Sequence, residues 1–322
     1  MKTGLIYTVL IIFAALIAYI ILGDIFSNNS NTKNPYKYEL ADFREVDPLL
    51  VKYREVKRIN TNTSKPKAID YYKGFLGIAY ENHLQLIDTT GQEYFLKSID
   101  GYITSLSFAP DGKIFLGCMD HIEVYDHNGE LLDKWDKIDS ASYITSIAFK
   151  GDVVFVADAG GPVVYRFNHE GELMNSFDGT GRIQSDYGFI VPSPYFDLAV
   201  DPDNQLWVAN TGIQCIENYT DIGELRAFWG KPSFQLEGFI GCCNPAQFSI
   251  LSNGSFVTSE KGMARIKVYY PSGELESVVA TPDDFDPDSE PADLTIDEDD
   301  GIYVLDISRQ MIRKFERKGN NG

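Results

Sequence analysis

The sequence lacks the short motifs that carry the common enzymatic chemistries. It contains no Gly-x-Ser-x-Gly elbow, no Walker phosphate loop, no Rossmann glycine fingerprint and no His-Glu-x-x-His zinc motif. Basic residues are also scarce, because 28 Lys and Arg stand against 47 Asp and Glu, which gives a net charge of −19. A surface this acidic repels phosphate backbones, so we expect no nucleic-acid partner. The missing motifs favour a binding function over an enzyme.

Long apolar runs are confined to the N-terminus. Residues 4–23 carry no charge, and as a helix they would span about 30 Å, the thickness of the hydrocarbon core of a bilayer. We predict a retained transmembrane anchor over residues 1–24, with a cleaved secretory signal as the alternative, although no Ala-x-Ala site follows. Lys2 is the only early charge, so the positive-inside rule places the N-terminus in the cytoplasm and the remainder outside, in the periplasm if the source is bacterial.

A short glycine turn recurs along the rest of the chain. Its copies are centred on Gly91, Gly129, Gly171, Gly223 and Gly273, and the later ones read Gly-Glu-Leu. Each copy follows an aromatic-bearing extended run and leads into a second one, which is the pattern of a β-hairpin. The roughly 40- to 50-residue spacing is expected when a four-stranded unit is repeated around an axis. Aromatic residues, at 13% of the chain, suit such strands.

The repeats predict six units, of which the last has only three strands. The alternating stretch Leu50–Ile59 can supply its fourth strand and close the ring. We therefore expect an all-β, six-bladed β-propeller closed by an N-terminal strand and preceded by one transmembrane helix. The predicted divisions are an anchor (1–24), a tether rich in Asn and Ser (25–49), the propeller (50–318) and a disordered tail (319–322).

Strand endings such as Phe155-Val156-Ala157-Asp158 and Trp207-Val208-Ala209-Asn210, followed by an apolar-polar strand and Gly-Glu-Leu, resemble the NHL-repeat family of six-bladed propellers. The resemblance covers about residues 50–316 and implies the fold. Members of that family include scaffolds, RNA binders, receptor modules and a few enzymes, so the resemblance leaves the function open.

One face of the predicted ring carries the longer connections. The connectors that lead from one blade to the next lengthen along the chain, whereas the turns on the opposite face stay short and polar, and His127 and His169 lie in those turns. Long connections are often functional, so we expect the connector face to bind the partner. Its candidate binding residues are His83, His121, Asp158, Asn210, Glu260, Arg265, Asp306, Tyr187 and Phe189, with Phe234 and Phe239 as further contact residues.

Repeat alignment also places Ile78, Cys118, Asp158, Asn210, Ser259 and Asp306 at equivalent strand ends on that face. All four cysteines, Cys118, Cys215, Cys242 and Cys243, map there. One interpretation is a disulfide from Cys215 to Cys242 or Cys243 that fixes a long connector. The other is a metal site built from cysteine and histidine.

The sequence implies no particular cofactor, and a divalent metal, Zn or Ca, is the alternative. The acidic stretch from Asp283 to Glu290 offers oxygen ligands for calcium but lacks EF-hand spacing, so a solvated loop is preferred. Two functions result. The first is a membrane-tethered extracytoplasmic module that binds a protein, peptide or other ligand, or serves as an accessory subunit of an envelope complex. The alternative is a metal-dependent enzyme or redox protein, lyase- or lactonase-like, with its site on the connector face.

Overall fold

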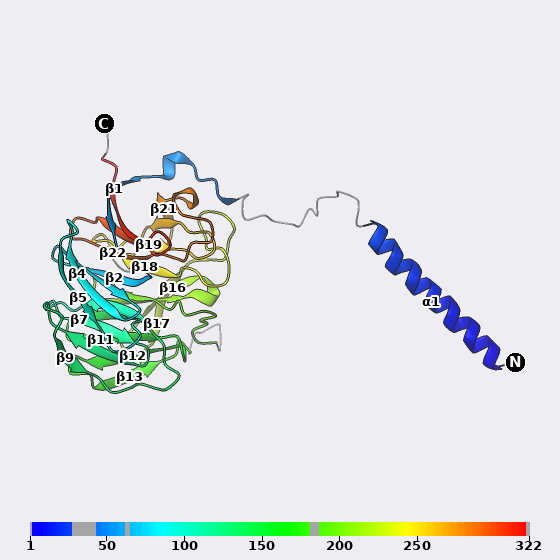
Figure 1. Cartoon of the computed structure of the whole chain (residues 1–322), viewed down its shortest axis with the longest axis horizontal. Coiled ribbons are helices and arrows are strands. Elements are labelled where there is room, and N and C mark those ends of the chain that lie inside the picture. The colour runs from blue at the N-terminus through cyan, green and yellow to red at the C-terminus, as the bar shows by residue number, and fades with distance from the viewer. Residues whose placement is uncertain (1, 28–42, 62–64, 181–186, 320–322) are drawn as a thin grey trace. The chain divides into compact units, whose positions relative to one another are not determined.

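A computed structural model describes residues 2–27, 43–61, 65–180 and 187–319 (Figure 1). The chain forms two compact units, residues 1–42 and 43–322. In the first unit, helix α1 (Lys2–Ser27) contains the stretch Ile6–Gly23, which is long and apolar enough to cross a membrane. The predicted tether falls largely outside the described residues, and so does most of the predicted tail.

The second unit is a ring of six four-stranded antiparallel sheets, which confirms the predicted six-bladed propeller (Figure 1). Each sheet follows chain order from the innermost strand outward, except the last. Blades 1 to 3 are formed by β2 (Pro66–Tyr72), β3 (Phe75–Tyr80), β4 (His83–Asp88) and β5 (Glu93–Ser98); β6 (Ser105–Phe108), β7 (Ile114–Cys118), β8 (His121–Tyr125) and β9 (Leu131–Lys134); and β10 (Ile144–Lys150), β11 (Val153–Asp158), β12 (Val163–Asn168) and β13 (Leu173–Phe177).

Blades 4 to 6 complete the ring. Their strands are β14 (Leu198–Val200), β15 (Leu206–Asn210), β16 (Cys215–Tyr219) and β17 (Leu225–Trp229); β18 (Gln247–Ile250), β19 (Phe256–Ser259), β20 (Ile266–Tyr269) and β21 (Leu275–Ala280); and β22 (Asp293–Ile296), β23 (Ile302–Asp306), β24 (Met311–Arg317) and β1 (Tyr53–Asn60). Short 3-10 turns are η2 (Pro48–Leu50), η3 (Thr211–Ile213) and η4 (Pro282–Asp284).

Strand β1 closes the ring as predicted. It pairs antiparallel with β24, from Tyr53 opposite Arg317 to Asn60 opposite Met311. The strand begins three residues later than the sequence pattern suggested, because residues 48–50 form η2, in which the Asp47 carboxylate accepts a hydrogen bond from the Leu49 N–H. The edge that blade 6 would otherwise leave open is therefore paired.

The apolar core lies between successive blades. Each buried cluster combines residues of two neighbouring sheets, as where Phe115 and Val124 of blade 2 pack with Ile147 and Val156 of blade 3. The recurring turn glycine belongs to this packing. Gly171 has a φ of +81°, and a Cβ placed there would lie 2.6 Å from the indole of Trp135 in the preceding blade. Glycine is thus required both for the left-handed backbone and for close approach to the aromatic ring.

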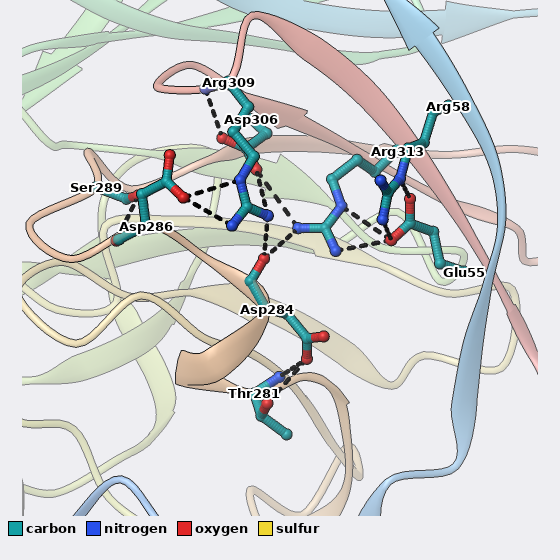
Figure 2. A network of polar contacts seen from close by, with 9 residues as sticks. All are labelled: Glu55, Arg58, Thr281, Asp284, Asp286, Ser289, Asp306, Arg309 and Arg313. Atoms are coloured by element: carbon teal, nitrogen blue, oxygen red, sulfur yellow. Dashed lines mark hydrogen bonds and ion pairs between the residues drawn. The ribbon is translucent and has the colours of Figure 1, made fainter.

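A buried ion-pair network secures the closure (Figure 2). The side chain of Arg313, which is only 2% exposed, donates to the Glu55 carboxylate of β1 at 2.8 Å and to the Asp284 carbonyl at 2.8 Å. Its guanidinium also lies 3.4 Å from Asp306. Arg309 donates to the same Asp284 carbonyl and to Asp286. One guanidinium thus joins β1, β23 and the connector between blades 5 and 6.

We predict that Arg313→Met lowers the free energy of unfolding by about 3 kcal/mol, because it leaves the buried Asp306 and the Glu55 carboxylate without this cation. Urea unfolding of the purified protein measures the change. The matched control is Arg58→Met, since Arg58 pairs with the same Glu55 from the exposed side, and exposed pairs contribute only about 0 to 1 kcal/mol. Equal losses in the two variants would contradict a special role for the buried guanidinium.

Candidate functional site at the mouth of the axial channel

The inner strands of the six blades surround an axial channel of about 370 Å³. Inner strands of neighbouring blades are not joined into one sheet, so some of their N–H groups need other acceptors. Three aspartates on these strands or beside them supply such acceptors. They are Asp70 in β2, Asp197 just before β14, and Asp293 at the start of β22.

Each of these aspartates bonds to a neighbouring blade. Asp70 accepts from the Phe108 N–H of blade 2 at 2.8 Å and from the Thr295 hydroxyl of blade 6 at 2.8 Å. Asp197 accepts from the Ser146 hydroxyl of blade 3 at 2.6 Å and from the Phe248 N–H of blade 5 at 2.7 Å. Asp293 accepts from the Ile69 N–H of blade 1 at 2.8 Å. The three carboxylates therefore link blades around the axis.

Enclosure within the ring favours the protonated form of these groups. Burial raises the pKa of Asp197 to about 6. Burial, followed by repulsion from Asp197 and Asp70, raises the pKa of Asp293 to about 8. Burial also raises the pKa of Asp70. Because all three carboxylates already accept hydrogen bonds from protein groups, their arrangement is explained by structural linkage.

The channel opens on the connector face into a mouth of about 160 Å³. Every blade contributes to it, and five of its lining residues are shared with the channel below. Its chemically distinctive residues are Lys67, Thr104, Tyr143, Tyr195, Gln247, Glu290 and Asp293. The axial channel also takes residues from all six blades, and the mouth is where this channel meets the connector residues Tyr195 and Glu290, which makes the mouth the candidate ligand site.

Two residues of the mouth, Lys67 and Tyr195, take part in contacts between a lysine ammonium and a tyrosine ring. The Lys67 ammonium lies 5.7 Å from the ring centre of Tyr102 and 4.0 Å from Glu81. The Lys261 ammonium lies 5.0 Å from the ring centre of Tyr195. Burial raises the pKa values of Tyr143 and Tyr195, so both phenols stay protonated and can donate hydrogen bonds. Such a surface can stack on a flat group and hydrogen-bond its polar edge.

Three of the predicted binding residues, Asp158, Asn210 and Asp306, hold backbone segments of the connector face. Asp158 accepts hydrogen bonds from the N–H groups of Tyr143 and Gly160, each at 2.8 Å. Asn210 accepts from the Ile190 N–H at 2.9 Å and donates to Glu217 at 3.1 Å. These side chains are fully buried, and Asp306 belongs to the closure network, so they position the connectors and do not form a contact surface.

The structure corrects the alignment of two strand ends. Ala79 pairs with Leu84 and Ser259 with Ile266, so Tyr80 and Glu260 are the equivalents of Cys118, in place of Ile78 and Ser259. The first correction is a shift of two residues, which keeps the same face of the strand because residues i and i+2 share a face, and the second is a shift of one residue.

Glu260 and Arg265 form a buried pair in blade 5. The Glu260 carboxylate accepts from Arg265 at 2.9 Å and lies 2.8 Å from the Lys267 ammonium. All three side chains are essentially inaccessible, and burial lowers the pKa of Lys267 to about 8. These charges serve the packing of the blade, and the predicted exposed binding cluster at this position was wrong.

The aromatic contact residues divide into two groups. Phe189 and Phe239, at 7% and 1% exposure, pack in the core, so both were wrongly expected at the surface. Phe189 contacts Phe177 and Tyr219. Tyr187 and Phe234 are largely exposed on connectors, and Phe234 stacks on Phe43.

No disulfide joins the four cysteines, so the expected link from Cys215 to the Cys242–Cys243 pair is not formed. The Cys215 thiol donates to the carbonyls of Ile213 and Gly230. The thiols of Cys242 and Cys243 lie 3.3 Å apart, with Cys242 exposed and Cys243 buried. Cysteine and histidine ligands are likewise not gathered around the axis among the described residues.

A smaller set of metal-ligand atoms does come together within blade 2. Cys118, His121 and Glu123 offer one ligand atom each, and these atoms all lie within 4.8 Å of one another. His83 occupies the equivalent place in blade 1 and instead contacts Asn82 at 2.8 Å. The acidic stretch is largely engaged by protein groups, since Asp284 bonds to Thr281 and Asp286 to Arg309, which weakens the calcium interpretation.

The mouth residues Lys67, Tyr143, Tyr195 and Glu290 were not predicted as a group. The glycine turn locates the middle and outer strands of each blade, but inner strands begin at different distances from it because the connectors differ in length. A usable signal existed in the polar residue that opens several inner strands, such as Gln247 and Asp293.

The fold and the channel define a six-bladed β-propeller with a connector-face mouth, and the comparisons agree with the fold. The sequence matches no family model and no curated protein. A streptogramin B lyase aligns with a TM-score of 0.58 and 13% identity, over 84% of this chain and 100% of the other. A virginiamycin B lyase from Staphylococcus aureus aligns with a TM-score of 0.57 and 15% identity, over 83% of this chain and 100% of the other.

A third solved structure, a protein of unknown function from Bacteroides thetaiotaomicron VPI-5482, aligns with a TM-score of 0.60 and 12% identity over 83% of this chain and 72% of that one. Identities this low establish a shared fold. Function on a shared fold is decided by the site.

The axial aspartates predict an unusual pH dependence. The unfolded Asp293 carboxyl titrates near its ordinary pKa of 3.8, whereas the folded group titrates near 8, so between these values the folded state holds the extra proton. We expect the free energy of unfolding to fall, by an amount on the order of 1 kcal/mol or more, as the pH rises from about 5 to about 8.

Urea unfolding at several pH values measures the slope of the free energy of unfolding against pH. Asp293→Asn removes the titrating group and should flatten the slope between about pH 6.5 and 8. Asp299→Asn, which changes an exposed residue of the following turn, should leave the slope unchanged. Stability that rises steadily toward pH 8 in the wild-type protein would contradict the prediction.

Proposed function

We propose that the protein is a membrane-anchored, extracytoplasmic binding module of the NHL-like propeller type, which holds a protein or peptide partner at the axial mouth. The observation that carries this proposal is the convergence of Tyr143, Tyr195, Lys67 and Glu290, from different blades, on one shallow opening. Tyrosines and cations that border a central depression are typical of the energetic centre of a binding surface.

The chemistry of the mouth supports a peptide-like ligand. Tyr102 and Tyr195 each lie against a lysine ammonium, and Glu290 adds an exposed carboxylate. A segment that offers a carboxylate, an amide edge and an aromatic or aliphatic side chain matches this combination of donors, acceptors and rings. In this proposal the partner belongs to an envelope complex, and the anchor keeps the propeller near the membrane.

A second candidate function is a metal-dependent enzyme, favoured by the thiol, imidazole and carboxylate of blade 2. The lyases that share the fold add analogy only. The cavity beside that cluster, of about 270 Å³, includes Tyr102, the same ring that Lys67 approaches. The two candidate sites are therefore neighbours on one face, and separate variants are needed to distinguish them.

Binding at the mouth is tested by placing a photo-reactive amino acid at Glu290, an exposed residue of its lining. In cells of the native source, we expect this position to give a discrete cross-linked adduct, identifiable by mass spectrometry. Tyr94, which is 57% exposed on the outer strand of blade 1, serves as the control and should give none. The purified partner should then bind Lys67→Ala/Tyr195→Ala at least about tenfold more weakly than wild type.

Two results would contradict the proposal: adducts from Tyr94 alone, or a partner whose affinity is unchanged by the Lys67 and Tyr195 substitutions. Far-UV circular dichroism of the double variant controls for folding. Both substituted side chains border the mouth and are partly exposed, so the fold should persist.

Topology has a test of its own, because Cys242 is the one exposed thiol among the cysteines, all of which are described. If the propeller is extracytoplasmic, a maleimide that cannot cross the inner membrane should label intact spheroplasts. Cys242→Ser should abolish the labelling, since the other three thiols are buried. Labelling that appears only after lysis would place the propeller in the cytoplasm.

A further inference from the structure

We propose that Cys118, His121 and Glu123 form a zinc-binding site in blade 2, with Asp120 as the positioning residue for the histidine. The site lies on the connector face and is separate from the axial mouth. The proposal rests on strand register, on the hydrogen bonds that orient the three side chains, and on the cavity beside them.

Strand geometry places the three side chains together. Cys118 ends β7 and pairs directly with His121, the first residue of β8. Residues directly opposite in an antiparallel pair lie on the same face of the sheet, and Glu123, two residues along β8, shares that face. The two-residue turn between the strands includes Met119 in a left-handed conformation, with a φ of +55°. The short spacing is therefore a property of the hairpin.

The hydrogen bonds orient the imidazole for metal binding. The Asp120 carboxylate lies 2.8 Å from His121 Nδ1, and Glu123 Oε1 lies 3.2 Å from His121 Nε2. When Nδ1 keeps its proton for Asp120, the Nε2 lone pair faces the Glu123 oxygen. A cation between these two acceptors would satisfy both, and a carboxylate behind a histidine is the usual second partner of a zinc-bound imidazole.

The Glu123 carboxylate is oriented by two hydrogen bonds, one of which comes from a cation. Its Oε2 accepts from the Tyr125 hydroxyl at 2.5 Å, and its Oε1 accepts from the Lys134 ammonium at 2.8 Å. Tyr125 and Glu123 are buried, whereas the Lys134 side chain is 52% exposed. Lys134 can therefore withdraw into solvent when a divalent cation takes its place, while Tyr125 keeps the carboxylate oriented.

The thiol and the space around it complete the site. Cys118 is buried at the end of β7, with its sulfur within 4.8 Å of the ligand atoms of His121 and Glu123. A cavity of about 270 Å³ borders Cys118 and His121 and extends to Ser140 and Ser142, which leaves room for a fourth ligand such as water. Thiolate, imidazole and carboxylate with one open position is a donor set that suits zinc. The ligand atoms need to close by roughly 1 Å for tetrahedral spacing.

The equivalent positions in three other blades are closed by protein partners. Asn210 bonds to Glu217 in blade 4, Glu260 pairs with Lys267 in blade 5, and Asp306 pairs with Arg313 in blade 6. In blade 2 the same face carries a thiol, an imidazole and a carboxylate, whose balancing cation is an exposed lysine. Blade 4 also has a cysteine, Cys215, at the position of His121, and it provides a matched control.

The experiment uses the full-length protein in detergent, stripped with a chelator and titrated with Co²⁺ and then Zn²⁺. Cys242→Ser/Cys243→Ser is the background, which removes the other adjacent thiols. We expect one Co²⁺ per chain, with the thiolate-to-cobalt absorption band and the intense visible bands of a tetrahedral site, and stoichiometric displacement by Zn²⁺. Cys215→Ser added to the background should leave the spectrum unchanged.

Cys118→Ser should remove the thiolate band, and Asp120→Asn should weaken Zn²⁺ affinity by about 10- to 100-fold without removing the band. Lys134→Gln should strengthen affinity, because it removes the competing cation. Circular dichroism verifies folding, and if Cys118→Ser does not fold, Glu123→Gln, which retains the Tyr125 contact, takes its place and should weaken Zn²⁺ binding. A thiolate band that persists in Cys118→Ser, or no 1:1 binding of Co²⁺ or Zn²⁺ by the folded background protein, would overturn the proposal.

Discussion

The fold depends on how the inner strands of a radial array satisfy their backbone groups. Six sheets that meet at one axis cannot all pair edge to edge, so their innermost N–H groups require acceptors from elsewhere. Asp70, Asp197 and Asp293 supply some of them, and with the hydroxyl groups that they also accept from they link each of the six blades to an adjacent blade. The consequence is a set of like charges in an enclosed space, which is tolerated because burial and mutual repulsion keep a share of the protons bound.

Ring closure and the candidate site are connected through one segment. The connector between blades 5 and 6 is held by Arg309 and Arg313, whose guanidiniums both donate to the Asp284 carbonyl (Figure 2). The same connector continues to Glu290 at the axial mouth. Closure by β1 therefore does more than remove a free edge. Glu55 of β1 holds the Arg313 guanidinium, and this guanidinium holds the connector at the Asp284 carbonyl. The position of Glu290 therefore depends on a residue near the start of the propeller.

The repeated glycine turn was sufficient to predict the propeller, because four of its five glycines, Gly129, Gly171, Gly223 and Gly273, lie against an aromatic ring of the preceding blade, and Gly91 lies against Ile59. The incomplete last unit was sufficient to predict the closing strand. The mouth could not be predicted in the same way. Lys67, Tyr195 and Glu290 come from different blades and from connectors of unequal length, and only the closed ring brings them together. Polar residues at strand ends such as Asp158 and Asn210 looked available in sequence, but backbone N–H groups of the connectors occupy them.

One repeated position on the third strand of each blade carries different residues in different blades, and these differences indicate which blade carries a binding site. Matched by strand register, the equivalent residue of each third strand is Gln85, Glu123, Tyr165, Glu217, Lys267 or Arg313. A position that serves only packing would be expected to be filled by similar residues, yet these include carboxylates and cations. In blades 5 and 6 the variation is balanced locally, since the cation at this position meets a carboxylate at the end of the adjacent strand. In blade 2 the carboxylate of Glu123 meets a thiol and an imidazole instead, with Lys134 approaching from solvent. A buried carboxylate requires a compensating charge. In blade 2 that charge is the exposed Lys134 ammonium, which another cation can replace. A replaceable partner is expected of a binding site and not of a structural ion pair.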